Sequence, residues 1–327
     1  MIGRREFIAG VGLTAAWPAY VAAQASQLPV IGLLSSGSLQ ALDGLLAAYR
    51  DGLREQGYVE GRNVLMTFRR AEGRYNELET LANDLVLRRV NLIVAQGGLV
   101  SAKAAMKATT SIPILFVVGF DPAQLGLVKR LNHPGGNATG VSLFTSELLP
   151  KQLSLLHELG PGIGSTAFLV NPDAVTAAAD IADLAAAAQQ MGYQLHLYKA
   201  RSESEIAAAF QSIGQEQVSA LLVAPDPFFT SRRDQIVKLA AQFAIPALYP
   251  WREYVEAGGL MSYGTGLTWA YNLLGRYTGR ILGGETADTL PVQQPTKFEL
   301  VINLKIVKAL GLTIPETLLA TADEVIQ

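Results

Sequence analysis

The chain has 327 residues, with 26 Lys and Arg against 28 Asp and Glu, and it contains no cysteine. Charge is nearly balanced and no run of basic residues forms a stripe, which argues against a nucleic-acid partner. The lack of cysteine excludes disulfides, thiolate metal sites, a cysteine nucleophile and a lipid-modified cysteine anchor. A chain of this length suits two domains of about 150 residues each.

The first 25 residues have the three-part pattern of an export signal. Arg4 and Arg5 precede an apolar run over 7–17, and small residues end the segment at Ala25. The run is too short to cross a bilayer, which takes about 20 apolar residues. The arginine pair resembles the twin-arginine address. We expect this signal to be removed after Ala25 and the mature protein to be free in the periplasm; the alternative, a buried N-terminal helix, would be interrupted by Pro18.

Short apolar runs rich in β-branched residues alternate with helical patterns along most of the chain. This alternation is typical of βαβ units and of parallel sheets covered by helices on both faces, so the predicted fold class is α/β. The first set of predicted strands begins at Val30, Val64, Leu92, Ile114 and Ala138, and the second set begins at Thr166, Gln194, Ala220, Pro246 and Gly259.

Helical periodicity fills the gaps between these strands. The first apolar stripe precedes Gly57 and consists of Leu42, Leu45, Leu46, Tyr49 and Leu53. An alanine-rich helix is predicted over 174–191, ended by Gly192, with further helices over 206–213 and 236–243. The uncharged stretch 257–275 contains glycines and polar residues, so it is predicted as a strand followed by a helix rather than a membrane span.

The two sets of strands resemble each other, which predicts two similar lobes. Both contain Ile-Pro at the start of a strand that follows an alanine-containing helix, in 111–122 and in 244–253. A late strand over 299–304 indicates that the chain passes between the lobes more than once. We therefore assign residues 28–143 plus about 265–295 to the N-terminal lobe, and 144–264 plus about 296–327 to the C-terminal lobe.

Polar residues follow several predicted strands, where parallel sheets bind their ligands. Asp121, Asn171 and Asp226 each precede a proline at a strand exit, a pattern that favours helix capping residue by residue. Together, several helix N-termini facing one crevice would suit a carboxylate, and an Asp would pair with an ammonium group. The exits of the first lobe add Ser35, Ser36, Gly97 and Gly98; the glycines serve either a tight turn or the close approach of a small anion.

Aromatic side chains gather at the same exits. Most aromatics in α/β proteins belong to the core, but Phe228, Tyr249 and Tyr263 lie at or just past predicted strand ends and are predicted to contact a ligand. No metal or other cofactor is predicted, because the three histidines are far apart and none has a metal-ligand spacing. No nucleophile elbow or P-loop motif occurs in the sequence, so we predict no catalytic residues.

Four motifs in chain order carry a resemblance to a known family. They are HPGGNATGV at 133–141, DPFF at 226–229, GGLMSYG at 258–264 and FELVINL at 298–304. They resemble the ABC-transporter substrate-binding family related to tryptophan- and tyrosine-binding proteins. The resemblance implies a type I periplasmic binding protein: two Rossmann-like lobes, joined by three crossings, with a ligand cleft between them. It also implies binding loops at Ser36, Asp121, Asn171, Asp226 and Tyr249.

The function expected from these features is binding without chemistry. The ligand is predicted to be a small carboxylate-bearing molecule, an aromatic or branched amino acid, held by hinge closure of a monomer. The ABC permease and ATPase would be separate chains, since this sequence has neither a membrane span nor a phosphate-binding motif. Two alternatives remain open at this point: an exported α/β hydrolase, and a ligand-sensing receptor that is not coupled to transport.

Overall fold

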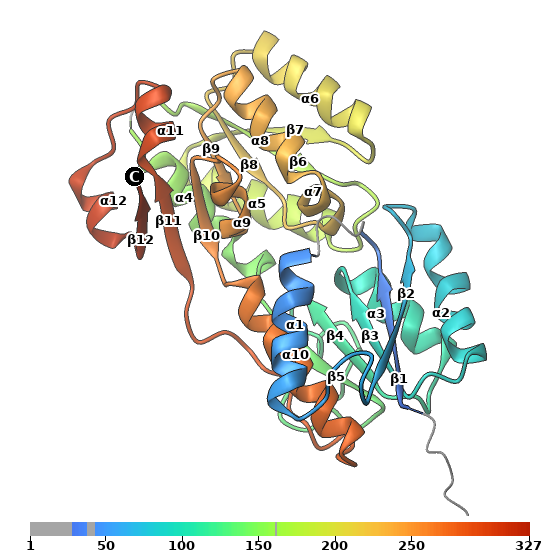
Figure 1. The fold of residues 1–327 in the computed structure, drawn as a ribbon. Coiled ribbons are helices and arrows are strands. Elements are labelled where there is room, and N and C mark those ends of the chain that lie inside the picture. Colours follow the sequence, from blue (N-terminus) through green and yellow to red (C-terminus); the bar gives the residue numbers. More distant parts are fainter. Residues whose placement is uncertain (1–27, 38–42, 161) are drawn as a thin grey trace, which may run out of the picture.

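Two separate β-sheets organise the chain, and helices cover both faces of each sheet (Figure 1). The computed structural model describes residues 28–37, 43–160 and 162–327. The predicted export signal lies outside the described residues, as does Leu42 of the first predicted helical stripe. Within the described ranges, no helix has the length and apolar character needed to cross a bilayer.

The first sheet contains five strands, all parallel, in the order β2-β1-β3-β4-β5. They are β1 (Val30–Ser35), β2 (Leu65–Arg70), β3 (Leu92–Gln96), β4 (Ile114–Val118) and β5 (Ala138–Ser142). Every residue of β3, β4 and β5 is buried, as expected for apolar runs covered on both faces. Edge strand β2 is mostly half-buried. The five strands predicted for this part of the chain are confirmed.

The second sheet contains seven strands in the order β12-β11-β10-β9-β8-β6-β7. They are β6 (Ser165–Val170), β7 (Gln194–Lys199), β8 (Ala220–Val223), β9 (Ala247–Tyr249), β10 (Met261–Gly264), β11 (Glu299–Asn303) and β12 (Glu324–Ile326). The strands β6 to β10 repeat the spatial order of β1 to β5, which confirms that the two halves are alike. The short edge strand β12 was not predicted.

One strand pair differs from the predicted parallel arrangement, because β10 and β11 are antiparallel. The chain leaves β10 beside the first lobe, runs through a helix of that lobe and then returns (Figure 1). Since it comes back to the end of the second sheet from which it left, β11 runs against β10. The antiparallel direction of β11 therefore results from the path of the chain through the first lobe, and no local pattern in the β11 sequence indicates that path.

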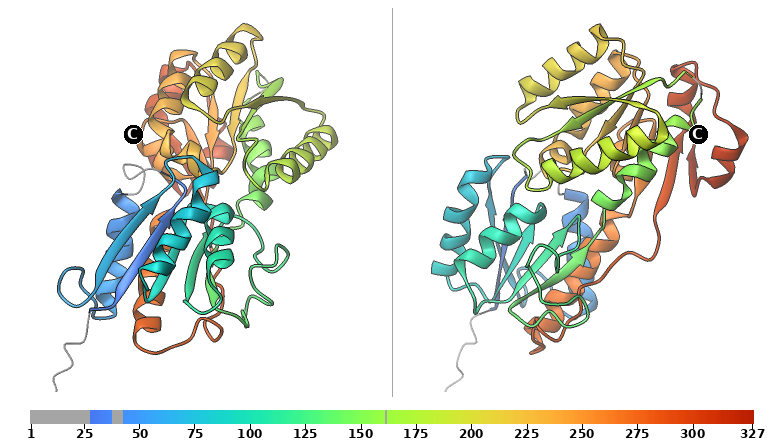
Figure 2. Two further views of the ribbon diagram at one scale, coloured as in Figure 1. Left: turned by 90° about the vertical axis from the view of Figure 1, so that its right-hand side faces the viewer. Right: turned by 180° about the vertical axis from the view of Figure 1, so that it is seen from behind.

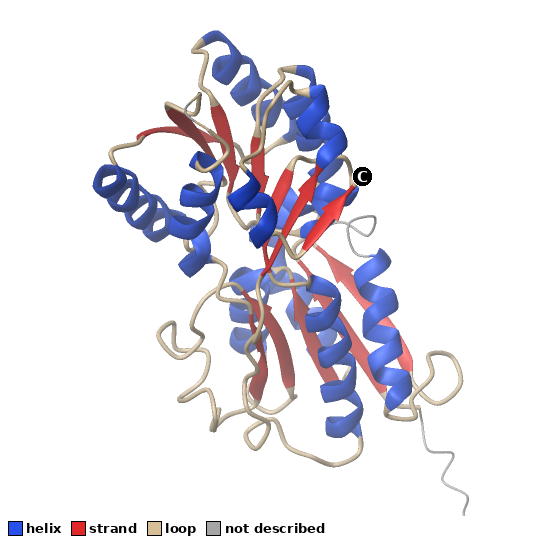
Figure 3. Cartoon of the chain, turned by 90° about the vertical axis from the view of Figure 1, so that its left-hand side faces the viewer, coloured by secondary structure: helices blue, strands red, loops and turns tan. Residues whose placement is uncertain are grey.

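The helices form the outer layers of each lobe (Figure 3). In the first lobe, α1 (Asp43–Glu55) and α10 (Leu267–Leu282) cover one face of the sheet, and α2 (Leu78–Leu87) and α3 (Gly98–Ala108) cover the other. In the second lobe, α4 (Leu149–His157) and α5 (Ala177–Met191) lie opposite α6 (Glu203–Gln215) and α8 (Arg233–Gln242). The shorter helices are η2 (Tyr75–Glu77), η3 (Ser146–Leu148), α7 (Pro227–Ser231), α9 (Arg252–Glu256), α11 (Leu304–Ala309) and α12 (Glu316–Thr321).

The predicted helix boundaries hold where a local signal sets them. Gly192 ends α5 in the left-handed conformation, with φ of 76°, as the glycine after the alanine-rich run predicts. That helix begins at Ala177 rather than Ala174, since the turn formed by Asn171 and the residues after it precedes the first helical residue. The uncharged stretch 257–275 forms β10 and the start of α10, which confirms the prediction of a strand and a helix.

The chain passes between the two lobes three times, after β5, after β10 and before β11 (Figure 2). In the second of these crossings α10 leaves the second sheet and packs against α1 and against strands of the first sheet. Gln293 then exchanges backbone hydrogen bonds with the β5 strand, donating to the Gly140 carbonyl and accepting from the Ser142 N–H, both at 2.9 Å. The lobe boundaries proposed from the sequence, with 265–295 in the first lobe, stay a prediction.

Candidate ligand-binding site

The carboxyl ends of the strands in the two sheets face each other across a cleft. Two adjoining cavities lie there, with volumes of about 100 and 50 Å³. Both sheets have their topological switch point at this edge, where strand order reverses around β1 and around β6, and such points are where open α/β sheets bind ligands. The residues that line both cavities are Gly97, Gly98, Gly119, Thr145, Pro225, Asp226 and Pro227.

The first-lobe wall is built from the exits of β1 and β3. Gly97 and Gly98 both have left-handed backbone conformations, with φ of 84° and 81°, and α3 begins at Gly98. The Ser36 hydroxyl donates a hydrogen bond to the Gly97 carbonyl at 2.8 Å, and a Cβ on Gly97 would overlap that hydroxyl oxygen. Ser35, which is buried, accepts a hydrogen bond from the Gly37 N–H at 3.1 Å and lines the larger cavity. The glycines therefore serve a tight turn and also form the cavity wall.

The second-lobe wall centres on Asp226, which is 4% exposed and lines both cavities. Its Oδ1 atom accepts hydrogen bonds from the N–H groups of Phe228 at 2.9 Å and Phe229 at 3.4 Å, so Asp226 caps α7, as the Asp-Pro pattern predicts. Burial raises the pKa of Asp226 to about 6, and the hydrogen bonds it accepts only partly offset that rise. Near neutral pH the cavity therefore carries a negative charge at this point.

Two further side chains hold Asp226 from different lobes. The Asn171 amide, at the exit of β6 in the same lobe, donates to Asp226 Oδ1 at 3.2 Å. The Tyr75 hydroxyl, in the segment between β2 and α2 of the first lobe, lies 3.3 Å from Oδ1 and 3.2 Å from Oδ2 and donates to this carboxylate. Tyr75 was not predicted, because nothing in the sequence around it marks a strand exit.

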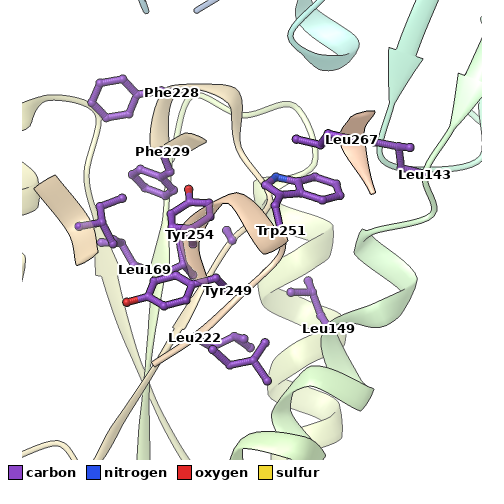
Figure 4. Packing of buried hydrophobic residues seen from close by; sticks show 14 of the residues in the cluster. Leu143, Leu149, Leu169, Leu222, Phe228, Phe229, Tyr249, Trp251, Tyr254 and Leu267 are labelled. Carbon is purple, nitrogen blue, oxygen red and sulfur yellow. The ribbon is translucent and has the colours of Figure 1, made fainter. Parts of the chain in front are cut away.

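Apolar side chains form the inner part of the larger cavity. Trp251 lies close to Leu143 and Leu267, and these side chains come from different segments of the chain (Figure 4). Leu45 of α1 and Tyr271 of α10 complete this apolar end. Trp251 follows the end of β9 by two residues, so its position after a strand could have identified it from the sequence as a ligand-contacting aromatic residue. The others come from helices of the first lobe or from the lobe crossing, where no local pattern indicates a ligand.

Several predicted site residues lie away from both cavity walls. Tyr249 is 1% exposed in the core and stacks on Tyr254 with ring centroids 4.8 Å apart (Figure 4). Phe228 is buried beside Phe229, with the ring centroids 5.7 Å apart. Tyr263 accepts a hydrogen bond from Gln152 through its backbone carbonyl at 2.7 Å.

Asp121 also lies outside the cavity walls, although it follows β4 in the same Asp-Pro pattern as Asp226. Its carboxylate accepts a hydrogen bond from the Ala123 N–H at 2.8 Å, which is a local turn contact. Ser36 supports Gly97 from behind rather than lining either cavity. The structure thus gathers Ser35, Gly97, Gly98 and Asp226 in the cavity walls, with Asn171 directly behind Asp226.

Two α/β lobes of repeated strand order that face each other across such a cleft define the class of type I periplasmic binding proteins. The sequence model for the family described as ABC transporter substrate binding protein matches residues 30–326 of this chain. The chain therefore belongs to the ABC transporter substrate-binding protein family. This confirms the family resemblance and the α/β fold class expected from the sequence.

Individual relatives agree with this assignment. The chain is 28% identical over 286 residues to a tyrosine-binding protein of Clostridioides difficile, covering 86% of this chain and 81% of that protein. A crystal structure from Streptococcus pneumonia in complex with L-Trp has 28% identity and a TM-score of 0.80, covering 92% of this chain and 100% of the other. A ligand-free, open structure of a substrate binding protein from Clostridium difficile has 26% identity and a TM-score of 0.62, covering 91% and 99%.

The family and these relatives are substrate-binding proteins rather than enzymes. The chain is accordingly a substrate-binding protein and not a hydrolase, which removes the enzymatic alternative. Substrate-binding proteins of ABC transporters are generally exported.

Proposed function

We propose that the chain is the periplasmic solute-binding component of an ABC importer and that it binds an aromatic or branched amino acid by hinge closure. One observation carries the proposal: the cavity between the lobes places a single buried carboxylate, Asp226, beside an apolar end and a wall of glycine and hydroxyl groups. No basic side chain lines either of the two cavities in the described part of the chain.

These walls suit the three parts of such an amino acid. The ammonium group pairs with Asp226, the one ionisable acid in the wall of the larger cavity among described residues. The carboxylate faces backbone N–H groups at the start of α3, near Gly98, and the hydroxyls of Ser35 and Thr145. The side chain enters the apolar end, where Trp251 offers an aromatic face.

The arrangement of the lobes supports hinge closure. At nearly equal sequence identity, 28% and 26%, this structure matches the complex with L-Trp at a TM-score of 0.80 and the open, ligand-free structure at 0.62. A ligand that contacts both walls favours the closed arrangement by its higher affinity for it. The permease would then recognise the closed shape, and the permease and ATPase would be separate chains. The export signal expected over residues 1–25 would deliver the protein to the periplasm.

A thermal-shift screen of the purified protein against amino acids, small carboxylates and sugars tests the ligand class. We expect L-tryptophan, L-tyrosine, L-phenylalanine or L-leucine to raise the Tm by about 5 to 10 °C at a thousand-fold excess over Kd, since a ligand that binds only the folded state stabilises it. A screen in which only sugars raise the Tm would contradict the amino-acid assignment. Unchanged uptake of the identified ligand in a strain lacking the protein would favour a sensing receptor instead.

Intrinsic fluorescence gives a second test, because Trp251 lines the cavity and is 6% exposed. Binding of a non-aromatic ligand such as L-leucine should change the emission of the parent protein, and Trp251→Phe should remove most of that change. Trp269→Phe is the matched control, since Trp269 lies on α10 with 37% exposure and outside the cavity walls. If Trp269→Phe removes the signal and Trp251→Phe keeps it, the ligand does not occupy this cavity.

A further inference from the structure

A side chain of the first lobe contacts the carboxylate at the centre of the opposite wall. Tyr75 belongs to η2, which joins β2 to α2 in the first lobe, whereas Asp226 follows β8 in the second lobe. The Tyr75 hydroxyl lies 3.2 Å from Asp226 Oδ2 and 3.3 Å from Oδ1. Burial and the neighbouring Asp226 raise the pKa of Tyr75, so its hydroxyl stays protonated and acts as the donor.

The second-lobe donors to Asp226 all contact Oδ1, whereas the Tyr75 hydroxyl of the first lobe lies within hydrogen-bond distance of both carboxylate oxygens. Oδ1 accepts from Phe228 and Phe229 N–H groups and from the Asn171 amide, all in the second lobe. Oδ2 has the Tyr75 hydroxyl as its hydrogen-bond partner among the described residues. A carboxylate oxygen accepts about two hydrogen bonds, which leaves Oδ2 with room for one more donor from the cavity.

The contact depends on close approach of the lobes. A Cβ on Gly73, two residues before Tyr75, would lie 3.4 Å from the Phe228 ring, and a Cβ on Gly98 would lie 3.5 Å from Pro227 Cγ. The first-lobe backbone at Gly73 and Gly98 thus leaves room for no more than a methyl group before the Phe228 and Pro227 side chains of the second lobe. Any hinge opening that separates these surfaces also breaks the hydrogen bond between Tyr75 and Asp226, because an extra ångström exceeds hydrogen-bond range.

We propose that Tyr75 is a positioning residue that stabilises the closed arrangement of the lobes through Asp226 and orients Oδ2 toward the ligand. The same carboxylate oxygen then joins lobe closure to ligand binding, since Tyr75 reaches it only when the lobes are closed. The part of this inference that concerns the ligand rests on the proposed function, whereas the effect on closure exists without any ligand.

Inter-lobe distances in the ligand-free protein test the inference directly. The native chain contains no cysteine, so spin labels attach only at introduced sites, and Leu87→Cys with Met191→Cys puts one on each lobe at side chains 81% and 40% exposed. In this labelled background, Tyr75→Phe should lower the ratio of closed to open molecules about ten-fold, the effect expected for one hydrogen bond to a charged group. Tyr58→Phe is the control, because the Tyr58 hydroxyl has no hydrogen-bond partner among the residues described.

A second comparison asks whether Tyr75 acts through Asp226. With Asp226→Asn already present, Tyr75→Phe should change the closed-to-open ratio by less than about three-fold, because the hydrogen bond to a charged acceptor no longer exists. A loss of packing alone would give the same change in both backgrounds. Equal closed populations in the parent and in Tyr75→Phe, including the case in which both are fully open, would overturn the inference.

Ligand measurements separate this inference from the proposed function. L-tryptophan, L-tyrosine, L-phenylalanine and L-leucine are added to the parent and to Tyr75→Phe, and dissociation from the variant should be about ten-fold faster for those that bind. If none of the four binds either protein, the proposed ligand class fails, while the ligand-free distances still decide the role of Tyr75. Equal dissociation rates from both proteins would overturn the coupling to the ligand.

Discussion

An Asp226→Asn variant is expected to lose at least about 30-fold in affinity for the amino acid that the parent binds, while it folds as stably as the parent. Asp226 is the buried carboxylate of the cavity wall, and it faces the position proposed for the ligand ammonium group. Losing one partner of a buried, hydrogen-bonded charge pair costs about 2 to 5 kcal/mol, which is a factor of about 30 or more in Kd.

The fold should tolerate this substitution for two reasons. Asn caps helices about as well as Asp, so its side-chain oxygen still accepts from the Phe228 N–H at the start of α7. In addition, burial raises the pKa of Asp226 to about 6, above the ordinary value for Asp. A raised carboxyl pKa in the folded state means that the free energy of unfolding falls as the pH rises through that value, so a neutral side chain removes a destabilising charge at neutral pH.

Calorimetric titration and a melting curve for each variant measure the two effects. The matched control is Asp121→Asn, the same change at the same Asp-Pro pattern but outside both cavity walls, where Kd should stay within about two-fold because no ligand contact is lost. The affinity of the parent should also fall between pH 7 and pH 5, about one unit either side of the raised pKa, as Asp226 becomes protonated. Equal losses in both variants, or full affinity in Asp226→Asn, would contradict this account of the site.

Gly52→Ala is expected to destabilise the protein by about 3 kcal/mol, because α1 and α10 pack at this glycine without room for a methyl group. A Cβ on Gly52 would overlap the Asn272 carbonyl oxygen, which belongs to backbone and has no freedom to rotate away. Gly275 on the facing helix is equally crowded, against the Tyr49 carbonyl. One turn further along, the buried Tyr49 hydroxyl and the Thr278 hydroxyl are hydrogen-bonded at 2.9 Å, so a shift of α10 would also disturb that pair.

Gly44→Ala is the matched control, since Gly44 lies on the same helix and an alanine Cβ there would meet no heavy atom of another element within 4 Å. Alanine stabilises an exposed helical site by about 0.5 to 1 kcal/mol relative to glycine. Denaturant unfolding of the three proteins should therefore place Gly44→Ala at or above the parent and Gly52→Ala well below it. A Gly52→Ala variant as stable as Gly44→Ala would mean that α10 does not pack on α1 as described.

Local sequence patterns predicted most of the secondary structure because strands and helices in this chain are set by local periodicity. The apolar runs at Val30, Leu92 and Ile114 are buried on both faces, and such runs have few alternatives to a central parallel strand. Glycine and Asx signals at helix ends worked for the same reason, as Gly192 and Asp226 show. The late strand predicted over 299–304 is β11, but its antiparallel direction and the edge strand β12 were not predicted, because both depend on the path of the chain through the other lobe.

Sequence by itself determined which loops surround the cleft, since the order of strands and the residues that follow them are local properties. Only the tertiary structure decided which side chains in those loops face the ligand. Asp121 and Asp226 have the same local pattern, yet Asp226 alone is buried opposite Tyr75. Tyr249 and Trp251 are two residues apart, but β9 directs the first into the core while the second lines the cavity. The physical reason is that a site between two lobes is formed by residues far apart in sequence, whose distances are set by how the lobes pack.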